Sequence, residues 1–230
     1  MSHVRKSWLT IVLLVLALGF NASAQTVQFL PEIDAYYKLN PNLRIWFQVK
    51  ETREGSDLTT AEIGPSLQFY LKPWAKLEGA TAFVLDESKA RPIIFSVGYR
   101  YLPTPDAPSE NRFEPIVTFH YPLKGRVLLT DRNRADLDWK SGNFSWRYRN
   151  RVQFERSVRI HSYRLRPYVS AEFFYESEYE KWSTTAVYAG CLFRVGKHVG
   201  FDPYYEHQNN TGKSPNQQLN QLGLALNLFF

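Results

Sequence analysis

The sequence predicts an all-β protein, an antiparallel transmembrane β-barrel of about 12 strands within a range of 10–12. Apolar and polar residues alternate with a period of two through segments of roughly ten to fourteen residues, which Pro, Gly, Asn and charged clusters separate. Aromatic residues make up 16% of the chain, and they favour both strands and membrane interfaces. The mean hydropathy is −0.37, so an integral membrane protein of this composition would be a barrel with a polar interior.

The last segment of the chain shows the alternation clearly. Its apolar residues share one face of an extended strand: Leu222, Leu224, Leu226, Leu228 and Phe230. Its small and polar residues share the other: Gln221, Gly223, Ala225 and Asn227. The segment resembles the C-terminal signal by which outer-membrane barrels are recognised for assembly. We therefore expect barrel-assembly machinery to recognise this strand, which would also seal the sheet against the first strand; the expected signal comprises Gly223, Leu226, Leu228 and Phe230.

The N-terminal segment is typical of a secretory signal peptide. Arg5 and Lys6 precede an apolar run from Trp8 to Phe20, and the small residues Ala22-Ser23-Ala24 follow it. The alternative is a membrane anchor, but the run is shorter than the ~20 residues that a spanning helix needs. We expect residues 1–24 to be the signal and residues 25–230 one barrel domain in the cell outer membrane. The formal charge of +6, less Arg5 and Lys6, leaves about +4, which does not favour a nucleic-acid partner.

Twelve alternating segments are the expected strands, and an even number suits an antiparallel ring. The segments are residues 29–39, 43–50, 61–71, 77–85, 93–101, 113–121, 127–137, 144–155, 163–173, 185–195, 199–205 and 220–230. Pro65 does not fit the third segment well, because proline cannot donate to a strand ladder. The proline-rich stretch Pro103–Asn111 is predicted to be a loop.

Basic residues share one parity within each of three consecutive predicted strands. Adjacent strands would bring these guanidinium groups into one wall on the barrel interior: Arg132, Arg134, Arg147, Arg149, Arg151, Arg164 and Arg166. Carboxylates on other strands are expected to form an opposing wall: Glu32, Asp34, Glu62, Glu172, Asp202 and Glu206. In one interpretation the two sets interdigitate and plug the barrel. In the other they line a water-filled, charge-selective passage; a barrel of this size favours the filled or nearly filled interior.

An enzyme is the alternative function. Around His207 the chain is a little like the active-site strand of outer-membrane lipid A deacylases, in which a nucleophilic Ser stands two residues after the His. Here that position is Asn209, which cannot be acylated as a serine can, and the supporting carboxylate would fall near Gln221. Thr211 and Ser214 have the wrong spacing. We therefore expect no enzyme activity, and since the histidines do not group at metal-ligand spacing, no metal and no cofactor.

Four short motifs resemble an uncharacterised family of bacterial outer-membrane barrels, domain of unknown function 2490. They are Gly98-Tyr99-Arg100-Tyr101, Asp131-Arg132-Asn133-Arg134, Trp146-Arg147-Tyr148-Arg149-Asn150-Arg151 and Tyr204-Tyr205-Glu206-His207. The resemblance implies the barrel fold and contact with outer-membrane lipid, and it implies no settled activity. The expected protein is a monomeric, non-enzymatic barrel that acts as a narrow or plugged channel or as an envelope component.

Overall fold

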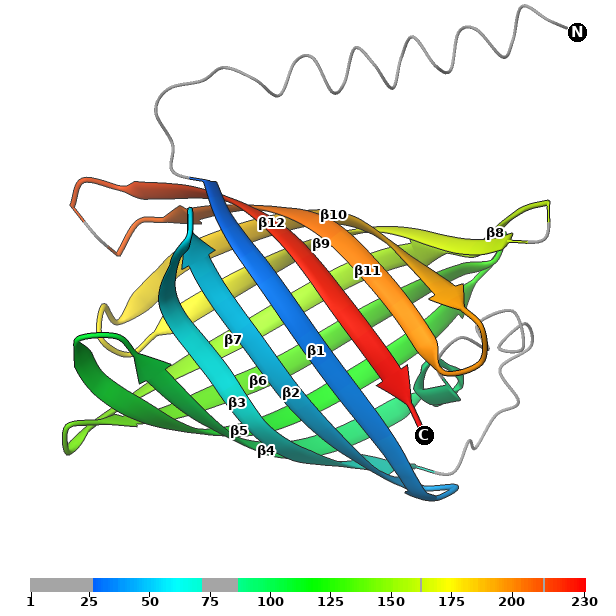
Figure 1. Cartoon of the computed structure of the whole chain (residues 1–230), viewed down its shortest axis with the longest axis horizontal. Coiled ribbons are helices and arrows are strands. Elements are labelled where there is room, and N and C mark those ends of the chain that lie inside the picture. Colours follow the sequence, from blue (N-terminus) through cyan, green and yellow to red (C-terminus); the bar gives the residue numbers. More distant parts are fainter. Residues whose placement is uncertain (1–26, 72–86, 162, 213) are drawn as a thin grey trace, which may run out of the picture.

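The computed structural model describes residues 27–71, 87–161, 163–212 and 214–230, and it forms a β-barrel (Figure 1). The predicted signal segment 1–24 and the predicted strand 77–85 lie outside the described residues. The strands are β1 (Val27–Asn40), β2 (Leu43–Glu54), β3 (Asp57–Tyr70), β4 (Ile93–Thr104), β5 (Ala107–Leu123), β6 (Val127–Lys140), β7 (Asn143–Arg156), β8 (Val158–Ile160), β9 (Tyr163–Glu176), β10 (Lys181–Val195), β11 (Val199–Asn210) and β12 (Gln217–Phe229). A single 3-10 turn, η2 (Glu87–Ala90), precedes β4 in the described part.

The predicted fold class, an all-β barrel, is confirmed. Eleven strands close into a ring, because β10 pairs with both β9 and β11 and β12 pairs with β1. The short strand β8 pairs only with the start of β9 and stands beside the ring. The ring therefore lies within the predicted range of strand numbers, although it is odd rather than even.

An odd ring cannot be antiparallel throughout. Neighbouring strands alternate in direction around the barrel, so the eleventh strand returns in the same direction as the first. The β1–β12 pair is accordingly parallel, running from Val27↔Asn220 to Tyr36↔Phe229. The expectation that the last strand seals the sheet against the first is confirmed, but the seal is parallel.

The parallel seam defines two ends of the barrel. Val27 and the β2–β3, β4–β5 and β6–β7 turns lie at one end, which we call the N-terminal end. Phe230 and the β1–β2, β5–β6 and β10–β11 turns lie at the other, the C-terminal end, together with η2 (Figure 1).

Side chains alternate between the two faces of the closed sheet. Large apolar side chains face outward on every long strand, for example Phe47, Phe95, Val187 and Leu222. The interior face is instead polar and charged, and its fully buried members include Arg100, Glu114, Asp136, Arg166 and Glu172. The molecule thus reverses the usual arrangement of an apolar core beneath a polar surface.

One sequence prediction about local structure needs correction. The stretch Pro103–Asn111 is not a loop: β4 runs to Thr104, β5 starts at Ala107, and only two residues connect them. Pro103 is accommodated because the register shifts between Leu102 and Thr104, so no regular ladder bond is required there.

In the part of the chain that is described, no helix is long and apolar enough to cross a membrane.

Gly223 in β12 makes room for an aromatic ring. It pairs with Tyr204 of β11, whose ring folds over it, and a Cβ at this position would lie 2.0 Å from the ring. Gly200, in the same pair of strands, has ordinary space, since its nearest contact to a Cβ would be 3.5 Å. Glycine is thus required by packing at the first position and not at the second.

We predict that Gly223→Ala destabilises the barrel and that Gly200→Ala does not. Overpacking against Tyr204 should lower the free energy of unfolding by about 1–3 kcal/mol. Gly200→Ala should be neutral or stabilising by up to roughly 1 kcal/mol, because alanine loses less backbone entropy on folding. Urea unfolding of the folded protein in detergent, followed by tryptophan fluorescence, measures both. Equal unfolding midpoints for the two variants would contradict the packing role of Gly223.

Candidate functional site

Arginine and carboxylate side chains form a continuous ion-pair network on the interior face of β3–β7 and β9. In the described part of the chain it joins seven arginines to six carboxylates. The arginines are Arg100, Arg112, Arg132, Arg134, Arg147, Arg149 and Arg151. The carboxylates are Glu62, Glu110, Glu114, Asp136, Asp138 and Glu172. The near balance of charge allows these groups to be buried together.

Glu172 of β9 is one centre of the network. Its two oxygens lie 3.0 Å from Arg149 Nε, 2.5 Å from Arg151 Nη2 and 3.3 Å from Arg132 Nη2. The Tyr188 hydroxyl also donates to Glu172 at 2.8 Å. Strand pairing explains the position, since Glu172 stands directly opposite Arg151 in the β7–β9 ladder. Three guanidinium groups therefore share one fully buried carboxylate.

Asp136 of β6 is the second centre. It pairs with Arg134 on its own strand and with Arg147 and Arg149 of β7 at 3.1 and 3.6 Å. The network continues from Arg147 through Asp138 to Arg112. Each guanidinium carries five N–H donors, so each arginine can join two carboxylates and extend the network.

Arg100 explains why a proline is tolerated inside β3. Its guanidinium Nη1 donates to the carbonyl oxygens of Pro65 and Tyr99, both at 2.9 Å. A Cβ on the neighbouring Gly64 would lie 2.0 Å from the Tyr99 carbonyl oxygen, so β3 and β4 approach unusually closely here. The fully buried Arg100 side chain thus supplies hydrogen bonds at the point where Pro65 offers no N–H.

The remaining predicted basic residues lie nearer the C-terminal end. Arg166 is fully buried and lies 3.5 Å from Glu155. Glu155 also pairs with Lys89 of η2, which links the 3-10 turn to the barrel wall. Arg164 occupies the same face of β9 but is exposed near the start of the strand, and it does not join the network.

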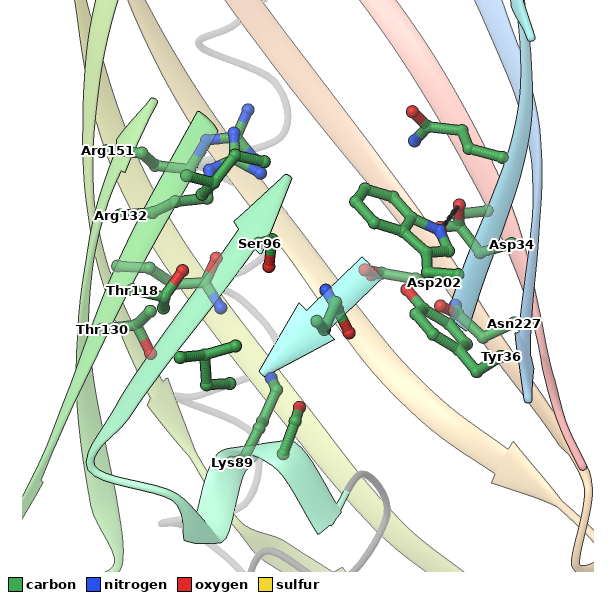
Figure 2. A pocket seen from close by; sticks show the side chains of 18 of the residues that line it. Asp34, Tyr36, Lys89, Ser96, Thr118, Thr130, Arg132, Arg151, Asp202 and Asn227 are labelled. Atoms are coloured by element: carbon green, nitrogen blue, oxygen red, sulfur yellow. Dashed lines mark hydrogen bonds between the residues drawn. The ribbon is translucent and has the colours of Figure 1, made fainter. Parts of the chain in front are cut away.

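A polar cavity of about 340 Å³ lies beside the network, on its C-terminal side. Four members of the predicted basic wall line it: Arg132, Arg134, Arg149 and Arg151. Figure 2 shows Arg132, Arg151, Thr118 and Thr130 on one side of the cavity and Asp34, Asp202, Asn227 and Tyr36 on the other. Lys89 of η2 lines it from the C-terminal end (Figure 2).

Five of the six carboxylates predicted to oppose the arginines divide into three groups. Glu32, Asp34 and Asp202 line the cavity from β1 and β11, away from the arginine-bearing strands β6 and β7. Glu62 also lines it but lies 3.6 Å from Arg112, within the network. Glu206 is buried on β11 and does not line the cavity.

The position of Glu172 corrects the predicted arrangement. It is not part of an opposing wall but stands among the arginines as their shared partner, because β7 and β9 are neighbours in the ring. Neighbouring strands place opposite charges side by side, and this satisfies buried guanidinium groups better than a carboxylate across the lumen could.

Five central residues of the network were missed from the sequence: Arg100, Arg112, Glu114, Asp136 and Asp138. The parity of β6 could have identified the two aspartates, since they alternate with the same outward residues as Arg132 and Arg134. Arg112 lay between the predicted loop and the next predicted strand, and Glu114 lay inside that strand, where its parity opposite to the outward Phe113 could have identified it. Arg100 belonged to a recognised motif, but nothing in the sequence shows that it inserts beside Pro65.

The predicted assembly residues all lie on or at the end of β12. Gly223 faces inward against Tyr204, and Leu226 and Leu228 fall on the face of the exposed Leu222. The Phe230 backbone continues the seam, since its N–H donates to the Tyr36 carbonyl and its carbonyl accepts from the Lys38 N–H.

His207, the catalytic candidate, faces outward near the last residue of β11, at the N-terminal end of the barrel. Its Nδ1 lies 2.9 Å from the side-chain oxygen of Asn220, and the Tyr205 hydroxyl donates to the same oxygen at 2.6 Å. Asn209 is two residues further along the same face and carries no nucleophile. Within the described ranges no group of three or more His, Cys, Asp or Glu residues could hold a metal ion.

Residues 27–219 match a family described as proteins of unknown function, DUF2490, and the chain belongs to that family. The resemblance of its arginine-bearing motifs to this family is thereby confirmed. The comparison with curated proteins found no match. The fold and the family together therefore define a β-barrel protein of the DUF2490 family.

We predict that Glu172→Gln strongly destabilises the protein. The substitution keeps the shape but removes the charge shared by Arg132, Arg149 and Arg151, and leaving buried charges unpaired costs about 3–5 kcal/mol. Glu178→Gln, in the exposed β9–β10 turn, is the matched control and should change stability by less than about 0.5 kcal/mol. Urea unfolding measures both, and an unchanged midpoint for Glu172→Gln would contradict the central role of this carboxylate.

Proposed function

We propose that this protein is an integral outer-membrane β-barrel whose lumen is closed by its ion-pair network, so that it serves the envelope without conducting ions freely. The observation that carries the proposal is the network itself, in which Arg100, Glu114, Asp136 and Glu172 are fully buried. Fully buried charges leave no continuous water path beside them. A filled interior is also what small barrels adopt.

The outward face supports the membrane assignment. Its exposed large apolar side chains include Phe47, Phe95, Phe113, Val187 and Leu222, spread around the ring. Contiguous apolar surface of this extent marks a membrane or protein contact. Outward aromatic residues stand close to the strand ends, as interfacial girdles require: Tyr101, Tyr121, Trp139 and Trp182. The signal pattern expected for residues 1–24 is consistent with export.

The proposed partners follow from the same surface. Outer-membrane lipid would cover the apolar belt, and barrel-assembly machinery would recognise β12 through Leu226, Leu228 and Phe230. Because the ring closes within one chain, the backbone N–H and C=O groups of its first and last strands pair with each other and need no partner chain. We therefore propose a monomer. An exported barrel has no nucleic-acid partner in this proposal.

We predict that the protein is recovered in the outer-membrane fraction, migrates faster on a denaturing gel before boiling than after it, and is silent in planar lipid bilayers. The double variant Arg134→Ser/Glu114→Ser should give discrete conductance steps, because it removes both members of a buried pair. Asp136 keeps Arg147 and Arg149, and Arg100 keeps its bonds to Gln48 and Ser66.

The matched control is Arg53→Ser/Glu51→Ser. These two residues form an ion pair of 2.7 Å on the outward face of β2, so their removal should leave the bilayer silent. A soluble periplasmic product without a gel shift would contradict the membrane assignment. Conductance steps from the wild-type barrel would contradict the closed lumen.

We also propose that the protein is not a lipid-modifying hydrolase, because the outward His207 has Asn209 where a nucleophile would be needed. Expression should leave the acyl chains of lipid A and of phospholipids unchanged, and His207→Ala should give the same lipid profile as the wild type. Mass spectrometry of extracted lipids measures both. Deacylation that depends on His207 would contradict this proposal.

A further inference from the structure

The cavity inside the barrel has two walls of different charge. On one wall Thr118, Arg132 and Arg151 form a row across β5, β6 and β7. The next row towards the C-terminal end adds His120, Thr130 and Gln153. All six line the cavity, and together they present guanidinium, hydroxyl and amide groups. The wall is therefore rich in hydrogen-bond donors and positive charge.

Part of this donor capacity is unused in the described structure. Thr130 Oγ1 and Arg132 Nε are buried and have no hydrogen-bond partner among the described residues. Arg132 also shares Glu172 with Arg149 and Arg151, and within the described part only Arg149 of these three reaches a second carboxylate, Asp136, so positive charge is in excess at this point. Buried polar groups without partners are uncommon and indicate a missing ligand or water. The position suits an anion with several oxygens, which guanidinium groups bind well.

The opposite wall carries three carboxylates, and Arg44 and Lys50 of the neighbouring β2 also line the cavity. Glu32 of β1 and Asp202 of β11 both pair in the ladders with Ala225 of β12, whose small side chain leaves space between them. Asp34 follows on the same face of β1, and Figure 2 shows it with Asp202 across the cavity from Arg132 and Arg151.

These three carboxylates have mainly neutral partners. Asp34 accepts a hydrogen bond from Trp46 Nε1 at 2.6 Å, and Glu32 accepts one from Gln48 Nε2 at 2.5 Å. Asp202 Oδ1 is buried and has no hydrogen-bond partner among the described residues. Lys50 stands beside Glu32 in the β1–β2 ladder, but within the described part none of the three has a cation at ion-pair distance. This wall therefore suits a bound cation.

The volume and the aromatic lining limit the size of the ligand. A volume of about 340 Å³ is at the small end of the range of ligand pockets. Tyr36, Trp46, Tyr188, Tyr204 and Phe229 also line the cavity and provide apolar surface between the charged walls. A compact molecule with a charge at each end fits these features.

We propose that the cavity binds a small zwitterion, with a phosphate or carboxylate group held by Arg132, Arg151 and Thr130 and a primary amine held by Asp34 and Asp202. The ligand enters from the C-terminal end, where Lys89 of η2 lines the cavity. Binding here is separable from closure of the lumen, because the fully buried Arg100, Glu114 and Asp136 do not line the cavity. The same chemistry occurs in a free aminoalkyl phosphate or carboxylate and in the headgroup of an aminophospholipid.

Titration calorimetry of the folded full chain in nonionic octyl glucoside micelles tests the site. The zwitterionic probes are phosphoethanolamine and β-alanine, and the single-charge probes are ethanolamine, inorganic phosphate and propionate. At least one zwitterion should bind about tenfold or more tightly than the single-charge probes, since it engages both walls with charge-assisted hydrogen bonds. Equal affinities for zwitterions and single-charge probes, or no binding of any probe, would overturn the proposal.

Substitutions locate the two ends of the ligand. Arg132→Gln and Asp202→Asn should each weaken binding of the zwitterion about tenfold or more, and Thr130→Val should weaken it several-fold, roughly the loss of one hydrogen bond. Arg159→Gln and Asp106→Asn, at exposed positions outside the cavity, are the matched controls and should bind like the wild type. Unchanged gel migration before boiling shows that each variant is folded. Wild-type affinity in both Arg132→Gln and Asp202→Asn would overturn the site.

Competition separates the two sources of the ligand. If phosphatidylethanolamine added to the micelles displaces the bound zwitterion and phosphatidylglycerol does not, the site takes a lipid headgroup. If neither lipid displaces it, the site takes a soluble zwitterion. Either result supports the proposed chemistry, and displacement by phosphatidylglycerol alone would overturn it, because that headgroup carries no amine.

Discussion

Pairing of buried charge inside the barrel is the interaction on which the rest of the structure depends. With the apolar side chains turned outward, the interior contains arginines and carboxylates that are sealed from solvent, and each would be costly to bury alone. Glu172 and Asp136 solve this problem by serving three guanidinium groups each. The network ties β3, β4, β5, β6, β7 and β9 together, so it supplies the internal cohesion that an apolar core supplies in other proteins.

Closure of the ring is the second constraint. Eleven strands can close only with one parallel pair, and β1–β12 is that pair. The parallel seam places Val27 and Phe230 at opposite ends of the barrel. In a ring with an even number of strands, these two residues would lie at the same end. It also brings Glu32 of β1 and Asp202 of β11 to either side of Ala225, and so creates the acidic wall of the cavity. The topology of the seam and the chemistry of the cavity are thus connected.

Much of the fold was predictable from alternation, because a closed sheet imposes one environment on each face of every strand. The long strands that carry Arg132 to Phe230, namely β6, β7 and β9–β12, were placed nearly as the structure has them, whereas the short β8 was not predicted. The parity of Arg149 and Arg151 placed these two residues on the interior face. The sequence was misleading at prolines inside strands, where another part of the structure makes up for the missing N–H group. Pro103 lies at a register shift within a hairpin, and Pro65 is supported by Arg100 from the neighbouring strand.

By itself the sequence determined which side chains face inward, because side-chain parity in a strand is a local property. It also determined that the interior would be charged and the outer face apolar. The tertiary structure alone decided which charges meet, because partners such as Arg149 and Glu172 come together only through the order and register of the strands. It likewise decided that the ring has eleven members, since closure depends on how the last strand meets the first. The ion-pair network and the two-walled cavity therefore depend on the order and register of neighbouring strands, and the sequence of a single strand does not determine these.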